Sequence, residues 1–368
     1  MPVTQNAGID AAIDATLDAT YALDPQPTGV ARYSRRLIAA LGEPALQPSL
    51  RITLAARPRR FIRLLREYHA PFRRVMLQEP LNLLLPRRTD LFHGLNQRLP
   101  AYRFRRAVTT IHDVFALSSD RYSSPDFQRK FGEVIRDAVR RSDAIITVSA
   151  YTRDELCRVT GADPARITVV HHGIDPPPPA PARSSPARPS NAALYFLTVG
   201  VVQARKNTLA AVRAIERLPS AIKLVVAGGD GYGAEETHDY VRRQGLGDRV
   251  RFVGHCDEAT LNGLYAGASA LIFPSYEEGF GFPVLEAMAR GLPVIAARAS
   301  SIPEIAADAA LLFHPDDDAG MAAACERIIE DRAFAEDLSA RGRRQASEFT
   351  WERTGQETLA VYRSLTGI

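Results

Sequence analysis

The sequence contains few cysteines and no long apolar run. Only three cysteines occur among 368 residues, and Cys157, Cys256 and Cys325 have neither the spacing of metal ligands nor that of a disulfide framework. No apolar run approaches the roughly 20 residues that a membrane-spanning helix needs. The N-terminus lacks the basic segment and apolar core of a secretory signal. We therefore expect a cytoplasmic protein without a structural metal site.

The length and composition are those of an ordinary globular protein. A chain of 368 residues can form two domains, each with its own core. Hydrophobic residues make up 46% and charged residues 24%, which lies within the usual range for soluble proteins.

Apolar runs typical of buried strands alternate with amphipathic runs typical of helices, which predicts parallel sheets with helical crossovers. A proline-rich segment from Pro176 to Pro189 divides two such series and reads as a stiff linker. The predicted fold is α/β, with two doubly wound Rossmann-like domains. In the first series we expect strands at 12–17, 52–55, 91–93, 108–111, 144–148 and 167–170, and helices at 31–41, 128–141 and 153–160. In the second we expect strands at 194–199, 223–227, 250–253, 270–273, 294–296 and 310–313, and helices at 208–218, 235–244, 258–266, 283–290 and 319–330.

Polar clusters directly follow several of the predicted strands. They are His112–Asp113, Arg205–Lys206, Gly228–Asp230, Glu278 and Ser300–Glu304. In open α/β sheets ligands bind beyond the carboxyl ends of the strands, so these clusters predict a site on one edge of each sheet.

The segment from Pro274 to Glu286 is the most informative of these clusters. Gly279 and Gly281 allow a tight turn, after which a helix begins near Pro283, so free amides and a helix N-terminus would face one small space. Such a space attracts phosphate oxygens. Glu278 and Glu286 bracket the turn and could accept hydrogen bonds from sugar hydroxyls. The combination suggests a nucleotide-sugar site.

Six motifs in order resemble those of retaining glycosyltransferases of the two-Rossmann-domain (GT-B) type, in the large family 4 that includes bacterial mannosyltransferases. They are Thr28–Tyr33, Ile111–Asp113, Val199–Asn207, Glu278–Glu286, Ser301–Glu304 and Phe349–Glu352. The resemblance implies two domains facing across a cleft, an acceptor domain at 1–182 and a nucleotide-sugar donor domain at 183–350. It also implies that a final helix, within 351–368, returns to the first domain.

The resemblance assigns the charge of the leaving diphosphate to Arg205 and Lys206. An arginine–lysine pair can take the place of a divalent metal as the electrostatic stabiliser, so no cofactor is expected beyond the donor substrate. Lys206 is one of only three lysines in a chain rich in arginine. The single Asp-x-Asp match, Asp316 to Asp318, precedes a predicted helix and is interpreted as a helix cap.

The same resemblance places the donor around the glycine turn. Glu278 would contact the sugar hydroxyls, Glu286 the ribose, and the amides of Gly279, Phe280, Gly281 and Phe282 the sugar and diphosphate. His112 would lie at the reaction centre, where its ring or its carbonyl contacts the sugar.

Other positions carry weaker assignments. Gly200 supplies a turn before the cationic pair, and Glu304 matches a family loop near the base or ribose. Gly29 would let the backbone approach the diphosphate, although the family often has two glycines there. His171 and His172 match a turn into the linker and are interpreted as structural.

The predicted function is transfer of a hexose, with retention, to a glycan or polyprenyl-linked hydroxyl acceptor in surface polysaccharide assembly. GDP-mannose is the first choice of donor, and UDP-glucose, UDP-N-acetylglucosamine and dTDP-rhamnose stay open. The alternative is a two-domain sugar or nucleotide-sugar binding protein without transferase activity. A nicotinamide-dependent oxidoreductase would need a Gly-x-Gly-x-x-Gly turn, which Thr28–Tyr33 does not supply.

Arginines crowd the segment from Arg51 to Arg106, although the net charge of the chain is only +4. Two interpretations stay open: a solvated, arginine-rich surface, or a face that contacts anionic lipid or a polyprenyl-diphosphate acceptor. The second would make the protein peripheral on the inner face of the membrane. Few aromatics are interleaved with the arginines, so we expect no nucleic-acid partner.

Overall fold

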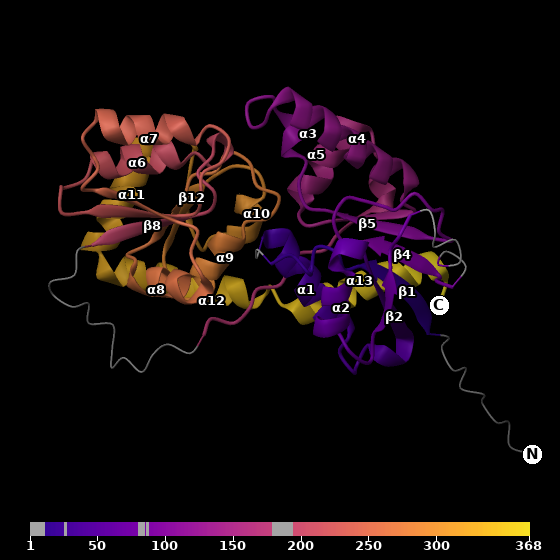
Figure 1. The fold of residues 1–368 in the computed structure, drawn as a ribbon. Helices are drawn as coiled ribbons and strands as arrows, with labels where there is room; N and C mark the ends of the chain where they lie inside the picture. The colour runs from indigo at the N-terminus through magenta and orange to yellow at the C-terminus, as the bar shows by residue number, and fades with distance from the viewer. Residues whose placement is uncertain (1–11, 26–27, 80–84, 86–87, 179–193) are drawn as a thin grey trace, which may run out of the picture.

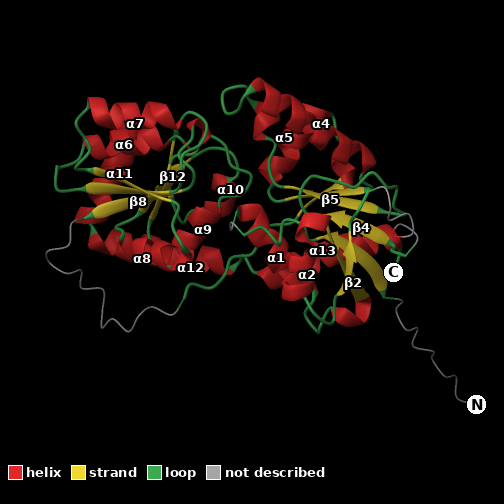
Figure 2. Cartoon of the chain, in the orientation of Figure 1, coloured by secondary structure: helices red, strands yellow, loops and turns green. Residues whose placement is uncertain are grey.

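The computed structural model describes residues 12–25, 28–79, 85, 88–178 and 194–368. They form two α/β domains side by side, as Figures 1 and 2 show. The predicted fold class is therefore confirmed. The expected boundary between residues 182 and 183 lies outside the described residues, as does most of the proline-rich segment.

The first domain is built on a parallel sheet with the strand order β3-β2-β1-β4-β5-β6-β7 among the described residues. Its strands are β1 (Ile13–Asp18), β2 (Leu50–Ala56), β3 (Arg73–Met76), β4 (Leu91–Gly94), β5 (Ala107–Ile111), β6 (Ala144–Thr147) and β7 (Ile167–Val169). Its helices are α1 (Gly29–Leu41), α2 (Pro58–Glu67), α3 (Phe115–Ser118), α4 (Pro125–Arg141) and α5 (Ala150–Thr160).

The second domain contains a parallel sheet with the order β10-β9-β8-β11-β12-β13 in the part of the chain described. Its strands are β8 (Tyr195–Val199), β9 (Lys223–Ala227), β10 (Val250–Gly254), β11 (Leu271–Phe273), β12 (Val294–Ala297) and β13 (Leu311–Phe313). Its helices are α6 (Thr208–Glu216), α7 (Ala234–Arg243), α8 (Glu258–Gly267), α9 (Phe282–Ala289), α10 (Ile302–Ala306), α11 (Asp318–Glu330) and α12 (Arg332–Ser347), and the chain ends with α13 (Trp351–Thr366).

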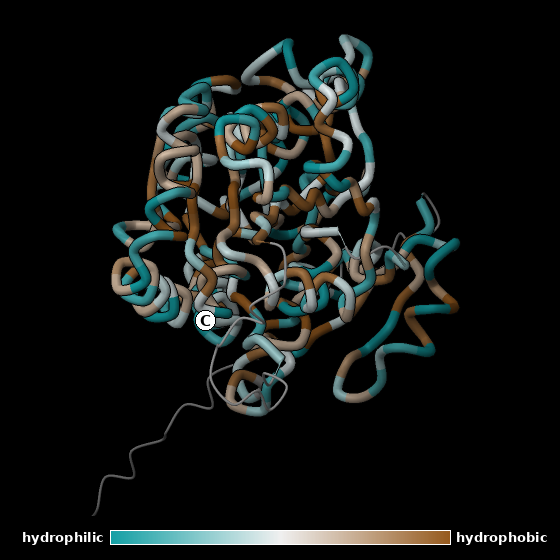
Figure 3. Tube along the Cα trace, turned by 90° about the vertical axis from the view of Figure 1, so that its left-hand side faces the viewer, coloured by the Kyte–Doolittle hydropathy of each residue, from teal (hydrophilic) through white to brown (hydrophobic). Residues whose placement is uncertain are grey.

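The central strands are buried on both faces because helices cover the two sides of each sheet. Every residue of β4, β5 and β6 is buried, which explains why these segments read as continuous apolar or small-residue runs. Figure 3 shows apolar stretches running through the interior and hydrophilic residues along the outer turns.

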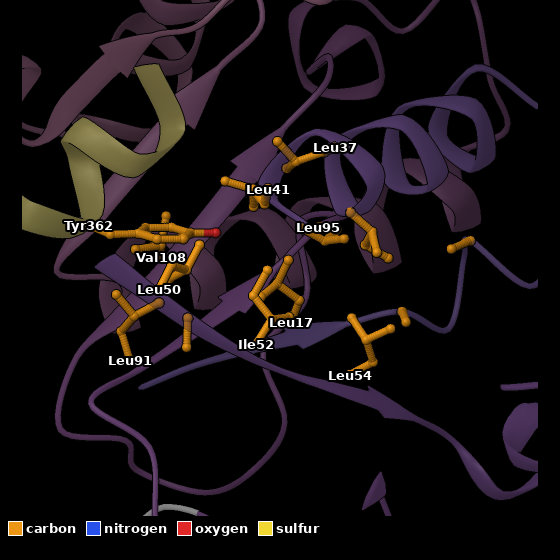
Figure 4. Packing of buried hydrophobic residues seen from close by; sticks show 14 of the residues in the cluster. Leu17, Leu37, Leu41, Leu50, Ile52, Leu54, Leu91, Leu95, Val108 and Tyr362 are labelled. Carbon is orange, nitrogen blue, oxygen red and sulfur yellow. The ribbon is translucent and has the colours of Figure 1, made fainter. Parts of the chain in front are cut away.

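Helix α13 packs on the first domain although it follows the second in the sequence. Tyr362 is fully buried and belongs to one apolar cluster with Leu41 of α1 and Leu50 of β2. Figure 4 shows its ring among these leucines and Val108. The end of the chain therefore ties the second domain to the first.

Five helices and strands of the described residues were not expected from the sequence: α2, β3, the short helices α3 and α10, and α12. In α2, Phe61, Leu64 and Leu65 have a helical spacing, but only Leu64 is fully buried and arginines lie between them. Strand β3 has no fully buried residue. Helix α12 buries Leu338, Gly342 and Ala346, and small residues give little hydrophobic periodicity. Gly342 allows α12 to approach Met288 of α9 closely.

Candidate functional site

Four of the five polar clusters that follow the strands meet between the two domains, whereas Gly228–Asp230 contacts the loop after β8 within the second domain. From the first domain come the loop after β5 and the N-termini of α1 and α5; from the second come the loops after β8, β11 and β12. Figure 1 shows α9 and α10 of the second domain turned toward the first. Direct hydrogen bonds between the two domains bring these segments together.

Arg205 and Lys206 converge on the carboxylate of Glu278. Lys206 Nζ lies 2.5 Å from Glu278 Oε1, and Arg205 Nη1 lies 3.2 Å from Oε2. The two cations follow the turn at Gly200, which has a φ of 137°. Asn207 (φ 51°) ends that loop, and its side chain donates to the carbonyl of Pro274 at 3.2 Å, so the loops after β8 and β11 are fixed to each other.

These three charges lie in a buried environment, where ion pairing decides their protonation. Burial raises the pKa of Glu278, but the Coulombic attraction of Lys206 and Arg205 outweighs it and holds that pKa below its ordinary value. Glu278 is therefore ionised. It is an acceptor for hydroxyl groups beside two cations that could face an anion.

The turn from Gly279 to Phe282 presents backbone amides at the start of α9. Gly281 has a φ of 118°, which favours glycine, and it caps α9. Among the described residues, the amides of positions 279–282 have no hydrogen-bond partner. Ser301 supports the turn by donating to the carbonyls of Glu278 and Phe280, at 3.0 and 2.7 Å. This is the geometry of an anion site at a helix N-terminus.

The first domain closes onto this turn. A Cβ atom at Gly279 would overlap the carbonyl oxygen of His112. Ser149 and Thr152, at the start of α5, donate from their hydroxyls to the carbonyl of Gly279 at 2.7 and 3.2 Å. The carbonyl of His112 therefore lies directly against the predicted sugar site.

The His112 ring is neutral and fixed in orientation. Burial lowers its pKa to about 4, and its Nε2 lies 2.9 Å from the carbonyl oxygen of Leu95. Because a carbonyl can only accept, Nε2 carries the proton and Nδ1 is left as an acceptor. Asp113 follows, and burial raises the pKa of its carboxyl against the attraction of Arg205.

Glu286 and Glu304 contact the first domain as well as their own. Arg32 of α1 forms an ion pair with Glu286 Oε1, and the hydroxyl of Tyr265 donates to Oε2 at 2.7 Å. Glu304 accepts hydrogen bonds from the amide of Ala150 at 2.9 Å and lies 2.6 Å from His171 Nε2. Glu304 thus occupies the N-terminus of α5, a position that the family assignment to the base or ribose did not anticipate.

The remaining assigned glycine and histidines line the same interface. Gly29 lies where an added Cβ would be 3.5 Å from the Phe282 ring. The His172 ring stacks on Phe282 with centroids 5.1 Å apart, while His171 holds Glu304. Of the assigned residues, Gly200, Arg205, Lys206, Glu278 and the 279–282 turn form one group, and His112 lies against it.

Several further residues at the interface were not assigned a role from the sequence, and four of them contact assigned residues. They are Arg32, Ser149, Thr152 and Tyr265. Ser149 gave a usable signal, because its side chain caps α5 by accepting from the Thr152 amide, which is a recognisable helix start. Nothing in the sequence indicates that Arg32 pairs with Glu286, which lies 254 positions away.

Within the described residues, no group of three or more histidine, cysteine, aspartate and glutamate side chains could hold a metal ion. In the Asp316–Asp318 segment, Asp317 caps α11 by accepting from the Gly320 amide at 2.8 Å. In the same part of the chain, no helix has the length and apolar character needed to cross a membrane.

Most of the chain matches two sequence families. Residues 184–345 match the family described as Glycosyl transferases group 1, and residues 27–177 match Glycosyltransferase Family 4. D-inositol 3-phosphate glycosyltransferase of Kribbella flavida is 32% identical over 72% of this chain and 68% of that protein. The chain belongs to glycosyltransferase family 4.

O-antigen chain mannosyltransferase B of Escherichia coli is 29% identical over 311 residues, 80% of this chain and 81% of that protein. Glycogen synthase of Mycobacterium tuberculosis is 33% identical over 69% of this chain but only 62% of its own length.

Solved structures agree on the GT-B fold of this glycosyltransferase. Sucrose-phosphate synthase of Thermosynechococcus elongatus superposes with a TM-score of 0.72 and 23% identity, over 96% of this chain and 99% of that one. HepE of Anabaena, solved in complex with UDP-glucose, gives a TM-score of 0.69 and 20% identity, over 96% and 99% of the two chains.

Proposed function

We propose that this family 4 glycosyltransferase moves a hexose, with retention of configuration and without a metal ion, from a nucleotide diphosphate sugar to a hydroxyl of a glycan or polyprenyl-linked acceptor. The observation that carries the proposal is the position of Lys206 and Arg205 on Glu278, directly beside the unpartnered amides of residues 279–282. Cations and amides suit a diphosphate, and the carboxylate suits sugar hydroxyls.

The proposed reaction proceeds on one face of the sugar. The bond between the anomeric carbon and the diphosphate oxygen breaks, and the acceptor oxygen attacks from the same side. The departing phosphate oxygen takes the proton of the acceptor hydroxyl. Arg205 and Lys206 stabilise the charge that develops on the diphosphate, and the buried His112 carbonyl stabilises positive charge on the sugar. Closure of the domains excludes water and limits hydrolysis.

GDP-mannose is the donor we favour, because a mannosyltransferase of O-antigen assembly is related along four-fifths of this chain. UDP-glucose is the second candidate, because HepE was solved with it and shares the fold.

The test is a thermal-shift screen with GDP-mannose, UDP-glucose, UDP-N-acetylglucosamine and dTDP-rhamnose, since a ligand of the folded form raises the melting temperature. Turnover of the selected donor, followed by NMR of the product's anomeric proton, then tests retention. An inverted product, or binding without turnover across an acceptor panel, would overturn the proposal.

We also propose that helix α2 contacts an anionic membrane surface near a polyprenyl-linked acceptor. On this helix Ile62 and Leu65 are 66% and 41% exposed, and arginines flank them within the Arg51–Arg106 segment. Apolar side chains beside cations suit the headgroup region of anionic lipid.

We expect the protein to cosediment with phosphatidylglycerol vesicles but not with phosphatidylcholine vesicles. Ile62→Glu should abolish it, whereas Phe127→Glu, at an exposed apolar residue of α4, should not. Equal recovery with both vesicle types would favour a merely solvated surface.

A further inference from the structure

Arg32 is the cation that the first domain brings to the donor site. It lies in the first turn of α1, three residues after Gly29, and its guanidinium pairs with Glu286 across the domain interface. The same guanidinium lies over the ring of Phe282, 5.4 Å from its centroid. Arg32 therefore contacts the last residue of the amide-lined turn and the carboxylate assigned to the ribose.

The carboxylate that Arg32 contacts already has both oxygens engaged. Arg32 occupies Oε1 of Glu286 and Tyr265 occupies Oε2, and Glu286 is only 6% exposed. If Glu286 binds the ribose hydroxyls, the buried carboxylate needs room that the guanidinium now fills. The ion pair and a bound ribose therefore compete for the space beside Glu286 Oε1.

The charges around the site indicate where Arg32 would go. Lys206 and Arg205 are both paired with Glu278, so an arriving diphosphate adds negative charge where the cations already have carboxylate partners. Glu286 lies four residues after Phe282 on α9, about one helical turn of roughly 5.4 Å from the amide-lined N-terminus. A long arginine side chain can move over that distance, and a guanidinium binds phosphate oxygens in a bidentate manner.

We infer that Arg32 is a diphosphate-binding residue, supplied by the acceptor domain, that leaves Glu286 for the donor's phosphates when the nucleotide sugar binds. The inference rests on the proposed donor site. It links donor binding to the relative position of the two domains, because Arg32 belongs to the first domain whereas the other diphosphate-binding groups belong to the second.

The test is calorimetric titration of the full chain with GDP, UDP and dTDP. Arg32→Ala should weaken binding of the tightest nucleoside diphosphate about tenfold or more, and Arg32→Lys should recover part of the loss. The corresponding nucleoside monophosphate should lose less than threefold. Arg36→Ala is the matched control, since Arg36 lies one turn further along α1 and pairs with Asp175 at 2.8 Å instead. Melting curves establish that each variant is folded.

The outcomes separate the inference from the function on which it rests. If Arg32 only holds the domains together, Arg32→Ala leaves diphosphate affinity unchanged or increases it, because Glu286 is freed; either result overturns the inference. Binding that Lys206→Ala weakens but Arg32→Ala does not would overturn the inference alone. A wild-type protein that binds none of GDP, UDP and dTDP would overturn the proposed function together with it.

Discussion

The backbone carbonyl of His112 and the α-carbon of Gly279 lie so close that no side chain fits between them. The two residues belong to different domains and are 167 positions apart, so this contact sets how near the two loops approach each other. Position 279 has a backbone that other residues could adopt, so it is the close approach that requires glycine there.

Gly279→Ala is therefore expected to lower the rate of sugar transfer about a hundredfold, because a Cβ would force the two loops apart and small misplacements of reacting groups are costly. Steady-state kinetics with the donor selected above measure the effect. Gly263→Ala is the control, since a Cβ at Gly263 in α8 meets nothing within 4 Å. Equal activity of the two variants would show that the contact has no role in transfer.

Lys206→Ala is expected to reduce kcat by roughly two to three orders of magnitude, on the scale of losing one preorganised electrostatic donor. The rate of donor consumption measures this directly. Lys223→Ala serves as the control, because Lys223 lies at the amino end of β9, opposite the carboxyl ends of the strands, and donates to the carbonyl of Asp248. Near-normal turnover of the Lys206 variant would rule out its role at the leaving group.

The sequence was sufficient to predict the fold because each buried strand is a short apolar run followed by a turn. Strand β9 was predicted at its observed bounds, and β1 and β5 within one residue at each end. Helix α2 was missed although Phe61, Leu64 and Leu65 have a helical spacing, because the arginines between them led us to interpret the segment as a charged surface.

The site was predictable only in part, for a physical reason. Parallel sheets bring the ends of their strands to one edge, so the sequence could group Lys206 with Glu278. It could not specify how two sheets on opposite sides of a linker meet. The bonds of Glu304 to the α5 amides and of Glu286 to Arg32 depend on that arrangement, and they change what these two carboxylates contact.

Glu278→Ala should separate sugar transfer from nucleotide binding. Loss of the carboxylate removes the proposed partner of the sugar hydroxyls and releases Lys206 and Arg205 from their ion pairs. We expect transfer to fall at least a hundredfold while nucleoside diphosphate affinity is retained or increased. Calorimetry and kinetics on the same preparation test both statements. Glu286→Ala is the matched variant, expected to weaken nucleotide binding, and an equal loss of affinity in the two would refute the division of roles.

Acid should destabilise this protein through its buried histidines. Burial lowers the pKa of His93 to about 3 and that of His112 to about 4, so both are neutral when folded. In the unfolded chain each has a pKa near 6.5. Between about pH 6.5 and pH 4 the unfolded state therefore binds protons that the folded state excludes, and the free energy of unfolding falls as the pH falls.

Each such histidine contributes up to about 1.4 kcal/mol per pH unit in that window. Urea denaturation at pH 7.5, 6.5 and 5.5 measures the slope.

His93→Gln removes one titrating group, although it also breaks the bonds of His93 to Tyr362 and Thr110, at 2.6 and 2.8 Å, and lowers stability at every pH. Its loss of stability between pH 6.5 and 5.5 should nevertheless be smaller than that of the wild type. His69→Gln, at an exposed position, should follow the wild-type curve. If the His93→Gln and wild-type curves run parallel, protonation of His93 does not drive the acid transition.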